Sequence, residues 1–434
     1  MISPSETEQL SESGPAALPG RPQALASALA SKIKILSLCC VYPNPSEPSL
    51  GLFVRSRLQH LGELADVKVI APLAAFDYSR WRAVRSIRRS VPKDRTDGNL
   101  EVLQPAWFYP PLGGWLNPLF LFSRLRRLAV HLRRDFPFHI IDAHFGYPDG
   151  IAAALLARCT RSPFSVTLRG NELMHARRKL RRAALGWALR RADAIIAVSE
   201  SLRRFAISLG AEPEKVKTIP NGVESRIYFP RNRVQCRVKL GLPAGGRFVL
   251  SAGALIERKG HHRVMEALKS LAEEGCTACL LIAGGPGREG SFVKELHQLP
   301  AKLNMQRRVR FFGEVSPERM AELMSAADVL CLASSREGWP NVVHEAMACG
   351  TPVVASNVGG VPEMIPSDHF GFVVPPGDPV ALAAALRSAL ENSWDRAAIA
   401  AWAHSRSWQQ VGREVLWTLC QAVAAGRHAE EQQR

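Results

Sequence analysis

Two glutamates and a proline lie close together in the segment Glu337-Gly338-Trp339-Pro340-Asn341-Val342-Val343-His344-Glu345. The residues before it, 328–332, are short and apolar and predict a buried strand. Pro340 suits the first turn of a helix, which we expect to continue over 342–349 and to end at Gly350. One carboxylate would then follow a strand, and the other would lie inside the next helix. This arrangement suits an anionic ligand with hydroxyl and phosphate groups, because carboxylates accept from hydroxyls while phosphates bind helix N–H groups.

Glycine-containing loops follow several predicted strands in the second half of the chain. A glycine lets the backbone approach a phosphate closely, and a nearby lysine supplies a compact positive charge. Gly253 follows one predicted strand and precedes Arg258 and Lys259, so this loop is a candidate diphosphate site. The loop after the next predicted strand contains Gly284 and Gly285 and would contact a nucleotide or form a plain turn, and Gly313 and Val315 follow a further predicted strand.

Three segments of the first half carry further candidate residues near predicted strand ends. His144 ends one predicted strand, and we expect its ring to face a cleft, although a lone histidine can also be structural. Arg169 and Asn171 follow the next predicted strand. Gly51 follows the loop after the first strand, where a glycine can end a turn.

The chain alternates predicted strands and helices in two halves of similar pattern. At 434 residues it is long enough for two domains, and the alternation predicts doubly wound parallel sheets. We therefore expect an α/β protein in which two Rossmann-like domains face each other across a cleft. The expected division is a disordered tail at 1–31, an N-terminal domain at 32–230, a C-terminal domain at 231–405, and a helix and tail at 406–434 that cross back onto the first domain.

The composition is that of a globular protein, with 47% hydrophobic and 22% charged residues. The nine cysteines lie mostly within apolar runs, and we interpret them as free thiols in a reducing cytoplasm. Cys276 and Cys279 have the spacing of a redox pair but lead directly into an apolar strand, so we expect no such role. The first residues predict no secretory signal, and the apolar run 112–122 is too short to span a membrane.

The formal net charge is +17, and the basic residues gather in the first half of the chain. Basic amphipathic segments with tryptophan suit an anionic membrane surface, although solvated helix faces give the same pattern. No nucleic-acid-binding signature accompanies them, so nucleic acid is not an expected partner. The three basic groups are Arg80, Arg82, Arg85, Arg88, Arg89, Lys93 and Arg95; Arg124, Arg126, Arg127, Arg133 and Arg134; and Arg177, Arg178, Lys179, Arg181, Arg182, Arg190 and Arg191.

The segment 337–345 reads Glu-Gly-x-Pro-x-x-x-x-Glu, which resembles the two-glutamate motif of the retaining glycosyltransferases of family 4, whose fold is GT-B. The resemblance covers about residues 33–410. One departure is Ala254, which stands where the family has an arginine that contacts a phosphate; either Arg258, beside the lysine, replaces that contact or the contact is missing. The other loops similar to motifs of this family are 49–54, 142–150, 167–172, 251–260, 312–315 and 357–363.

The resemblance implies a role for each candidate residue, with the acceptor on the N-terminal domain and the nucleotide sugar on the C-terminal domain. Glu337, His144 and Lys259 would be catalytic, with Glu337 and His144 near the donor sugar. Lys259 and Arg258 would bind the diphosphate, and Glu345 would accept from the ribose hydroxyls. The other donor-side residues would be Gly51, Gly253, Gly284, Gly285, Gly313, Val315, Gly338, Pro340 and Asn341, and the acceptor-side residues would be Arg169 and Asn171.

The resemblance further implies transfer of a glycosyl group from a nucleotide diphosphate sugar to a hydroxyl acceptor, with retention of the anomeric configuration. The expected acceptor is a lipid-linked sugar or a polysaccharide-precursor glycan. We expect the protein in the cytoplasm, peripherally bound at the inner face of the membrane. No Asp-x-Asp pair occurs in the chain, so we expect no metal ion, and we expect no other cofactor.

Alternatives from other functional classes stay open. One is a non-catalytic sugar-nucleotide-binding or membrane-associated scaffold protein of the same fold. Another is a different reaction on that fold, such as phosphorolysis or epimerisation of a sugar nucleotide. A dinucleotide oxidoreductase is disfavoured, because no Gly-x-Gly-x-x-Gly follows the first predicted strand.

Overall fold

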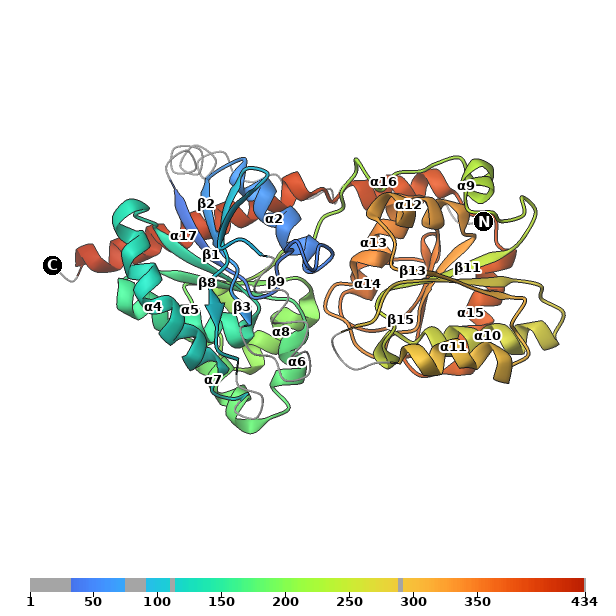
Figure 1. The fold of residues 1–434 in the computed structure, drawn as a ribbon, viewed down its shortest axis with the longest axis horizontal. Helices are drawn as coiled ribbons and strands as arrows, with labels where there is room; N and C mark the ends of the chain where they lie inside the picture. The colour runs from blue at the N-terminus through green and yellow to red at the C-terminus, as the bar shows by residue number, and fades with distance from the viewer. Residues whose placement is uncertain (1–32, 75–90, 110–113, 288–291, 433–434) are drawn as a thin grey trace, which may run out of the picture.

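The computed structural model describes residues 33–74, 91–109, 114–287 and 292–432, which form two α/β domains lying side by side (Figure 1). The expectations for the tail at 1–31 and for the arginines between 80 and 89 fall outside the described residues. Within the described part, no helix is both long and apolar enough to cross a membrane.

The N-terminal domain is built on an eight-stranded sheet that is parallel except where β4 joins its edge. β1 lies inside the sheet, since its Leu38 pairs with Ile70 of β2 on one side and Ala143 of β7 on the other. The inner strands β7, β8 and β9 are fully buried, as expected for parallel strands covered on both faces. The strands in spatial order are β10 (Val216–Thr218), β9 (Ala194–Ala197), β8 (Phe164–Leu168), β7 (Ile140–His144), β1 (Lys34–Leu38), β2 (Asp66–Ile70), β5 (Leu100–Leu103) and β4 (Asp94–Asp97).

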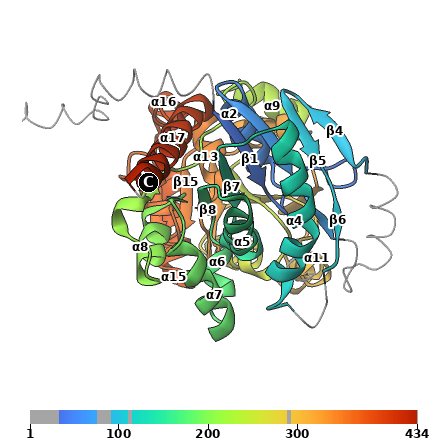
Figure 2. The ribbon, with the colours of Figure 1, turned by 90° about the vertical axis from the view of Figure 1, so that its left-hand side faces the viewer.

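Helices cover both faces of this sheet (Figure 2). On one face, α4 (Asn117–Asp135) buries Leu121, Leu125, Ala129 and Leu132, which recur at helical spacing, and turns its arginines outward. The other face packs α2 (Leu52–Gly62) and α17 (Trp408–Gln432) into a separate core. The remaining elements of the domain are the strand pair β3 (Leu73–Ala74) and β6 (Ala106–Trp107), the wide turn Gly146–Gly150, and the helices α5 (Ile151–Thr160), α6 (Asn171–His175), α7 (Lys179–Leu189) and α8 (Glu200–Ser208).

The C-terminal domain contains a six-stranded sheet in which every pairing is parallel. Its strands in spatial order are β13 (Val309–Gly313), β12 (Cys279–Ala283), β11 (Phe248–Ala252), β14 (Val329–Leu332), β15 (Val353–Ser356) and β16 (Gly371–Val374). Its helices are α9 (Arg233–Lys239), α10 (His261–Glu273), α11 (Val293–Lys302), α12 (Pro317–Ala326), α13 (Asn341–Ala348), α14 (Val361–Met364), α15 (Pro379–Glu391) and α16 (Arg396–His404).

The chain passes between the domains at two adjacent places. The N–H of Val223 donates to the carbonyl of Arg406 at 3.1 Å, and Val223 also pairs with Ser407 in a short parallel bridge. A side chain at Gly222 would come within 2.5 Å of the Trp408 backbone nitrogen, so a glycine is needed for this approach. Beyond the crossing, α17 packs along the N-terminal domain, while Val223 and Tyr228 belong to the core of the C-terminal one.

The expected fold class, two Rossmann-like domains facing across a cleft, is confirmed, but several local expectations need correction. Pro340 is extended (φ −76°, ψ 92°) and precedes α13, which begins at Asn341, so the proline is not in the first helical turn. The helix α5 begins at Ile151, because Gly146–Gly150 form a wider turn before it. Strands β3, β4, β5, β6, β10 and β16 were not predicted; β4, for example, is the polar segment Asp94–Asp97 and carries no apolar pattern.

Candidate functional site

A cavity of about 700 Å³ lies between the two domains. It is lined by the loops that follow β1 and β8 in the first domain and β11, β12 and β14 in the second. These loops meet because the carboxyl ends of parallel strands share one edge of a sheet, and the two sheets face each other across that edge. The predicted site residues on the cavity wall are Gly51, Arg169, Asn171, Gly253, Arg258, Lys259, Glu337, Gly338, Pro340 and Asn341.

Other predicted residues lie behind the wall. Gly284 and Gly313 join the ends of β12 and β13, where the Gly284 N–H donates to the Gly313 carbonyl at 2.8 Å. The carbonyl of Gly285 accepts from the Leu255 backbone at 2.8 Å. Val315, like these glycines, supports the loops without lining the cavity, and Pro286, Gly287 and Glu314 form the wall in their place.

Lys259 and Glu337 form the central ion pair of the site, with Nζ and Oε1 2.7 Å apart. Arg258 approaches the same carboxylate at 3.5 Å and also donates to the Arg336 carbonyl at 2.8 Å. Burial opposes ionisation of Glu337, but the charges of Lys259 and Arg258 outweigh it and hold the pKa of this carboxyl below its usual range. The cavity therefore contains an ionised carboxylate with two cations beside it.

Glu345 lies in α13, behind the cavity wall, with its side chain partly exposed. Burial raises its pKa to about 7, and the positive charge of Lys259 only partly opposes that shift. Within the described residues, its carboxylate has no hydrogen-bond donor. The described part of the protein therefore leaves its acceptor capacity unused.

The two domains touch through glycines at the cavity. Gly170, with φ +115°, and Gly338 lie so close that a side chain on Gly338 would come within 2.0 Å of the Arg169 carbonyl oxygen. The Gly360 N–H also donates to the Gly338 carbonyl at 2.8 Å, so the loop 357–363 supports the turn that carries Glu337. Only glycine permits this approach of two backbones.

His144 does not line the cavity, which corrects the expectation that its ring faces the cleft. Its side chain is fully buried at the end of β7, beneath Arg169. Arg169 donates to the ring Nδ1 at 3.0 Å, and since arginine can only donate, the proton resides on Nε2, 3.2 Å from the carboxylate of Asp142. Burial lowers the pKa of His144 to about 4 despite the nearby Asp142, so the ring is neutral at pH 7. The histidine therefore orients Arg169 from below.

Arg169 itself is 8% exposed and comes from the loop after β8. Its guanidinium donates to Asn221 Oδ1 at 3.1 Å and packs over the Phe53 ring, 5.1 Å from the ring centre. Burial, together with the charge of Arg57, lowers the pKa of Arg169 to about 9, which leaves it protonated at pH 7.

Two residues that hold this region together were not among the predicted site residues. Glu172 is fully buried and accepts from the backbone N–H groups of Gly146, Arg169 and Gly170 at 2.7–3.1 Å. Asn221, between the domains, accepts from Arg169 and donates to Asn341 Oδ1 at 3.0 Å. The sequence signal for Glu172 was its place in the loop 167–172, whereas no motif pointed to Asn221.

Polar contacts also cross between the domains at the edge of the site. The Ser49 hydroxyl donates to Glu314 Oε1 at 2.6 Å, and the backbone N–H of Glu200 donates to Glu363 Oε1 at 2.9 Å. Both carboxylates belong to the C-terminal domain, and each accepts from the N-terminal one. These contacts join the two domains beside the cavity.

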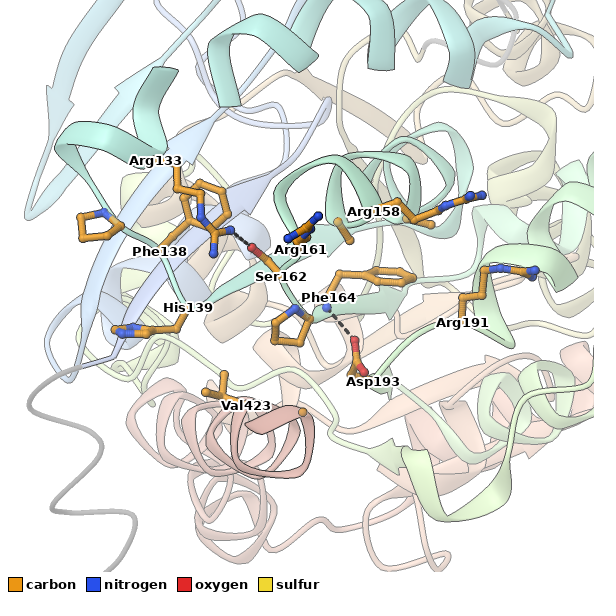
Figure 3. A pocket seen from close by; sticks show the side chains of 15 residues that line it. Arg133, Phe138, His139, Arg158, Arg161, Ser162, Phe164, Arg191, Asp193 and Val423 are labelled. Carbon is orange, nitrogen blue, oxygen red and sulfur yellow. Dashed lines mark hydrogen bonds between the residues drawn. The ribbon is translucent and has the colours of Figure 1, made fainter. Parts of the chain in front are cut away.

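A separate hollow of about 810 Å³ lies at the amino ends of β7, β8 and β9 and holds none of the predicted site residues (Figure 3). Arginines rim it, while Asp193 inside it accepts from the Phe164 N–H at 2.8 Å. The arginines follow or end helices: Arg133 ends α4, Arg158 and Arg161 lie at the end of α5, and Arg191 follows α7. Cations at helix C-termini complement the helix dipole, which accounts for this cluster without a ligand.

Comparison with known proteins identifies relatives along most of the chain. The family model "Glycosyl transferase 4-like domain" matches residues 53–222, and "Glycosyl transferases group 1" matches 233–406. The putative teichuronic acid biosynthesis glycosyltransferase TuaC of Bacillus subtilis is 28% identical over 83% of this chain and 90% of its own length. A D-inositol 3-phosphate glycosyltransferase of Xylanimonas cellulosilytica is 32% identical, over 53% of this chain and 57% of that relative.

Solved structures agree on the fold. HepE of Anabaena, crystallised with UDP and glucose, superposes with a TM-score of 0.68 at 24% identity, over 89% of this chain and 99% of that one. Sucrose-phosphate synthase of Thermosynechococcus elongatus superposes with a TM-score of 0.65 at 22% identity, over 92% and 99% of the two chains. With family models matching both domains, the chain belongs to the group 1 glycosyl transferases and is a glycosyltransferase of the GT-B fold.

Proposed function

We propose that this glycosyltransferase moves a sugar from a nucleotide diphosphate sugar to a hydroxyl acceptor and retains the anomeric configuration. The observation that carries the proposal is the Lys259–Glu337 ion pair, 2.7 Å long, in a cavity walled by both domains. A carboxylate beside cations can accept from sugar hydroxyls while the cations face a diphosphate. Glu345, with a free carboxylate on α13, would accept from the ribose hydroxyls.

The reaction needs stabilisation of the departing diphosphate more than it needs a strong nucleophile. Lys259 and Arg258 offer positive charge on one side of the cavity, beside Gly253, whose own N–H is already used by the Ala283 carbonyl at 2.9 Å. Glu337 would hold the donor sugar so that its anomeric carbon faces the acceptor side. We propose front-face attack, in which the acceptor proton passes to the leaving phosphate oxygen.

We propose that the reaction requires neither a metal ion nor another cofactor. The chain has no Asp-x-Asp pair, and side-chain cations already occupy the part of the cavity where a diphosphate would bind. Lys259 and Arg258 would supply the charge that a divalent ion supplies elsewhere.

The proposed acceptor is a lipid-linked sugar or polysaccharide-precursor glycan at the cytoplasmic face of a membrane. Similarity to TuaC, named for teichuronic acid biosynthesis, supports a polysaccharide product. Exposed apolar side chains and arginines mix along α4, where a hollow of about 1020 Å³ suits a peripheral contact with anionic lipid. The residues that carry this surface are Phe108, Trp115, Leu119, Arg124, Arg126, Arg127, Val130 and Arg134.

Calorimetric titration of UDP and of GDP, in EDTA, tests the proposal. We expect one of them to bind the wild-type protein at micromolar strength and to bind Glu345→Ala at least about tenfold more weakly, since a charged hydrogen bond is lost. The variant Arg413→Gln, on the exposed side of α17, is the matched control. If neither nucleotide binds the wild-type protein, the proposal fails and the scaffold alternative takes its place.

A further inference from the structure

We infer that Arg169, supplied by the N-terminal domain, binds the sugar-side phosphate of the donor diphosphate. The inference rests on the proposed function and extends it to a residue that the resemblance assigned to the acceptor side. It makes Arg169 a catalytic residue, because its guanidinium would face the oxygen that leaves the sugar.

The first observation is that Arg169 is a buried cation without an anion. At 8% exposure it has lost most of its water, yet no carboxylate in the described part of the chain lies at ion-pairing distance from it. Two acids lie near but bind other groups: Asp142 faces Arg57 at 3.4 Å and His144 at 3.2 Å, and Glu172 accepts from backbone N–H groups. A buried unpaired charge is costly unless something compensates it. An anionic ligand would do so.

The second observation concerns its hydrogen bonds. The partners of Arg169 are uncharged: the His144 ring at 3.0 Å and the Asn221 side-chain oxygen at 3.1 Å. These two contacts use only part of the donor capacity of a guanidinium, and the buried Nε–H has no acceptor among the described residues. Donors therefore remain for a ligand. Phosphate oxygens match the planar guanidinium well.

The other cations of the cavity already have an anion. Lys259 lies 2.7 Å from the Glu337 carboxylate and Arg258 lies 3.5 Å from it, so part of their charge is neutralised before any donor binds. Arg169 shares the same cavity wall without such a partner. A diphosphate would therefore be attracted most strongly by Arg169, because no carboxylate neutralises the charge of its guanidinium.

The place of Arg169 identifies which phosphate it would meet. Its own carbonyl lies against Gly338, the residue next to Glu337, and Glu337 is the proposed sugar contact. A cation at this turn is therefore beside the sugar end of the diphosphate. The guanidinium of Arg169 is fixed in this position by three contacts. It stacks over the Phe53 ring, and it donates to His144 and to Asn221.

In the proposed step the bond between the anomeric carbon and the phosphate oxygen breaks, and its electron pair stays on that oxygen. The acceptor oxygen forms the new bond to the anomeric carbon and loses its proton to the leaving phosphate. Arg169 would stabilise the negative charge that develops on this phosphate together with Lys259. Since the two cations belong to different domains, donor binding would also join the domains.

The test compares binding of a nucleoside diphosphate with binding of the matching monophosphate, without acceptor, by calorimetry. UDP and UMP, or GDP and GMP, are chosen by which diphosphate binds the wild-type protein. We expect Arg169→Gln to weaken diphosphate binding at least about tenfold and monophosphate binding by less than about threefold, because only the terminal phosphate loses a partner. Arg169→Lys should show a smaller loss, and Arg413→Gln should match the wild-type protein.

Several results would overturn the inference. Equal weakening of both ligands would mean that Arg169 only supports the fold of the loop. Unchanged diphosphate binding with lost turnover would assign Arg169 to an acceptor phosphate instead. If Arg169→Gln does not fold, as judged by its melting curve, the diphosphate-to-monophosphate affinity ratio of Arg169→Lys decides, and an unchanged ratio refutes the inference. A wild-type protein that binds neither diphosphate would instead refute the proposed function.

Discussion

The ionisation of Glu345 provides a quantitative test of the site. Burial raises the pKa of this carboxyl to about 7, well above the ordinary value for glutamate. An ionised carboxylate carries no proton and accepts hydrogen bonds through both of its oxygens. We therefore expect the ionised form of Glu345 to accept from the two ribose hydroxyls. Affinity for a nucleotide sugar should therefore fall as the pH drops below 7 and level off above about pH 8.

The expected size of this effect follows from the pKa. At pH 5.5, about one and a half units below the pKa, roughly one carboxyl in thirty is ionised, so binding should be about thirtyfold weaker than at pH 8.5. Glu345→Gln cannot ionise and should bind weakly with little pH dependence. A nucleotide sugar is the preferred ligand, because its diphosphate is esterified at both ends and lacks the second phosphate ionisation near pH 6.

The same shift has an opposite consequence for stability. The pKa of Glu345 is higher in the folded protein than in the unfolded chain, so the fold loses stability as the pH rises from the ordinary glutamate value to about 7, and the loss stays complete above that pH. The melting temperature of Glu345→Gln should be higher than that of the wild-type protein at pH 8, and the two should be equal near pH 4.5. Calorimetric titrations of the nucleotide sugar at several pH values measure the predicted change in affinity. Identical pH profiles of affinity for the wild-type protein and Glu345→Gln would refute the reasoning.

Three further substitutions test other parts of the account. Glu337→Gln removes the anion beside Lys259, so steady-state kinetics should show kcat falling about a hundredfold, with a smaller change in the Kd of the nucleotide; an unchanged kcat would exclude a role at the donor sugar. Gly338→Ala places a methyl group 2.0 Å from the Arg169 carbonyl oxygen, so small-angle scattering should show separated domains and activity should be lost while the melting temperature changes little; a compact, active variant would contradict the close contact. Asp142→Asn leaves the buried Arg57 without its anion and should cost about 3–5 kcal/mol in urea unfolding, whereas a cost near zero would mean that the pair contributes nothing.

The fold and the C-terminal half of the site could be predicted because their signals are local. Short apolar strands followed by glycine loops fix which residues emerge at the carboxyl edge of a sheet, and this placed Gly253, Lys259 and Glu337 correctly on one cavity wall. The segment 94–97 shows where this approach fails, since an edge strand with polar residues carries no apolar pattern.

Contacts between distant residues could not be predicted in this way. Ser49 and Glu314 are 265 positions apart, and Arg169 and Asn221 are 52 positions apart, so no spacing within one element indicates their pairing. The burial of His144 was also hidden, because the position of a residue at a strand end does not say whether the next loop covers it. The side chain of Arg169, from the neighbouring strand end, lies over that histidine and takes the position expected for its ring.

The anomeric configuration of the first sugar released tests the central claim most directly. The wild-type protein is incubated in EDTA with UDP- and GDP-hexoses and no acceptor, so that water slowly replaces the acceptor, and proton NMR records the product before it mutarotates. We predict release from one nucleotide class with the configuration of the donor, and no release by Glu337→Gln. Release of the inverted anomer, or release that requires an added divalent metal, would contradict the account.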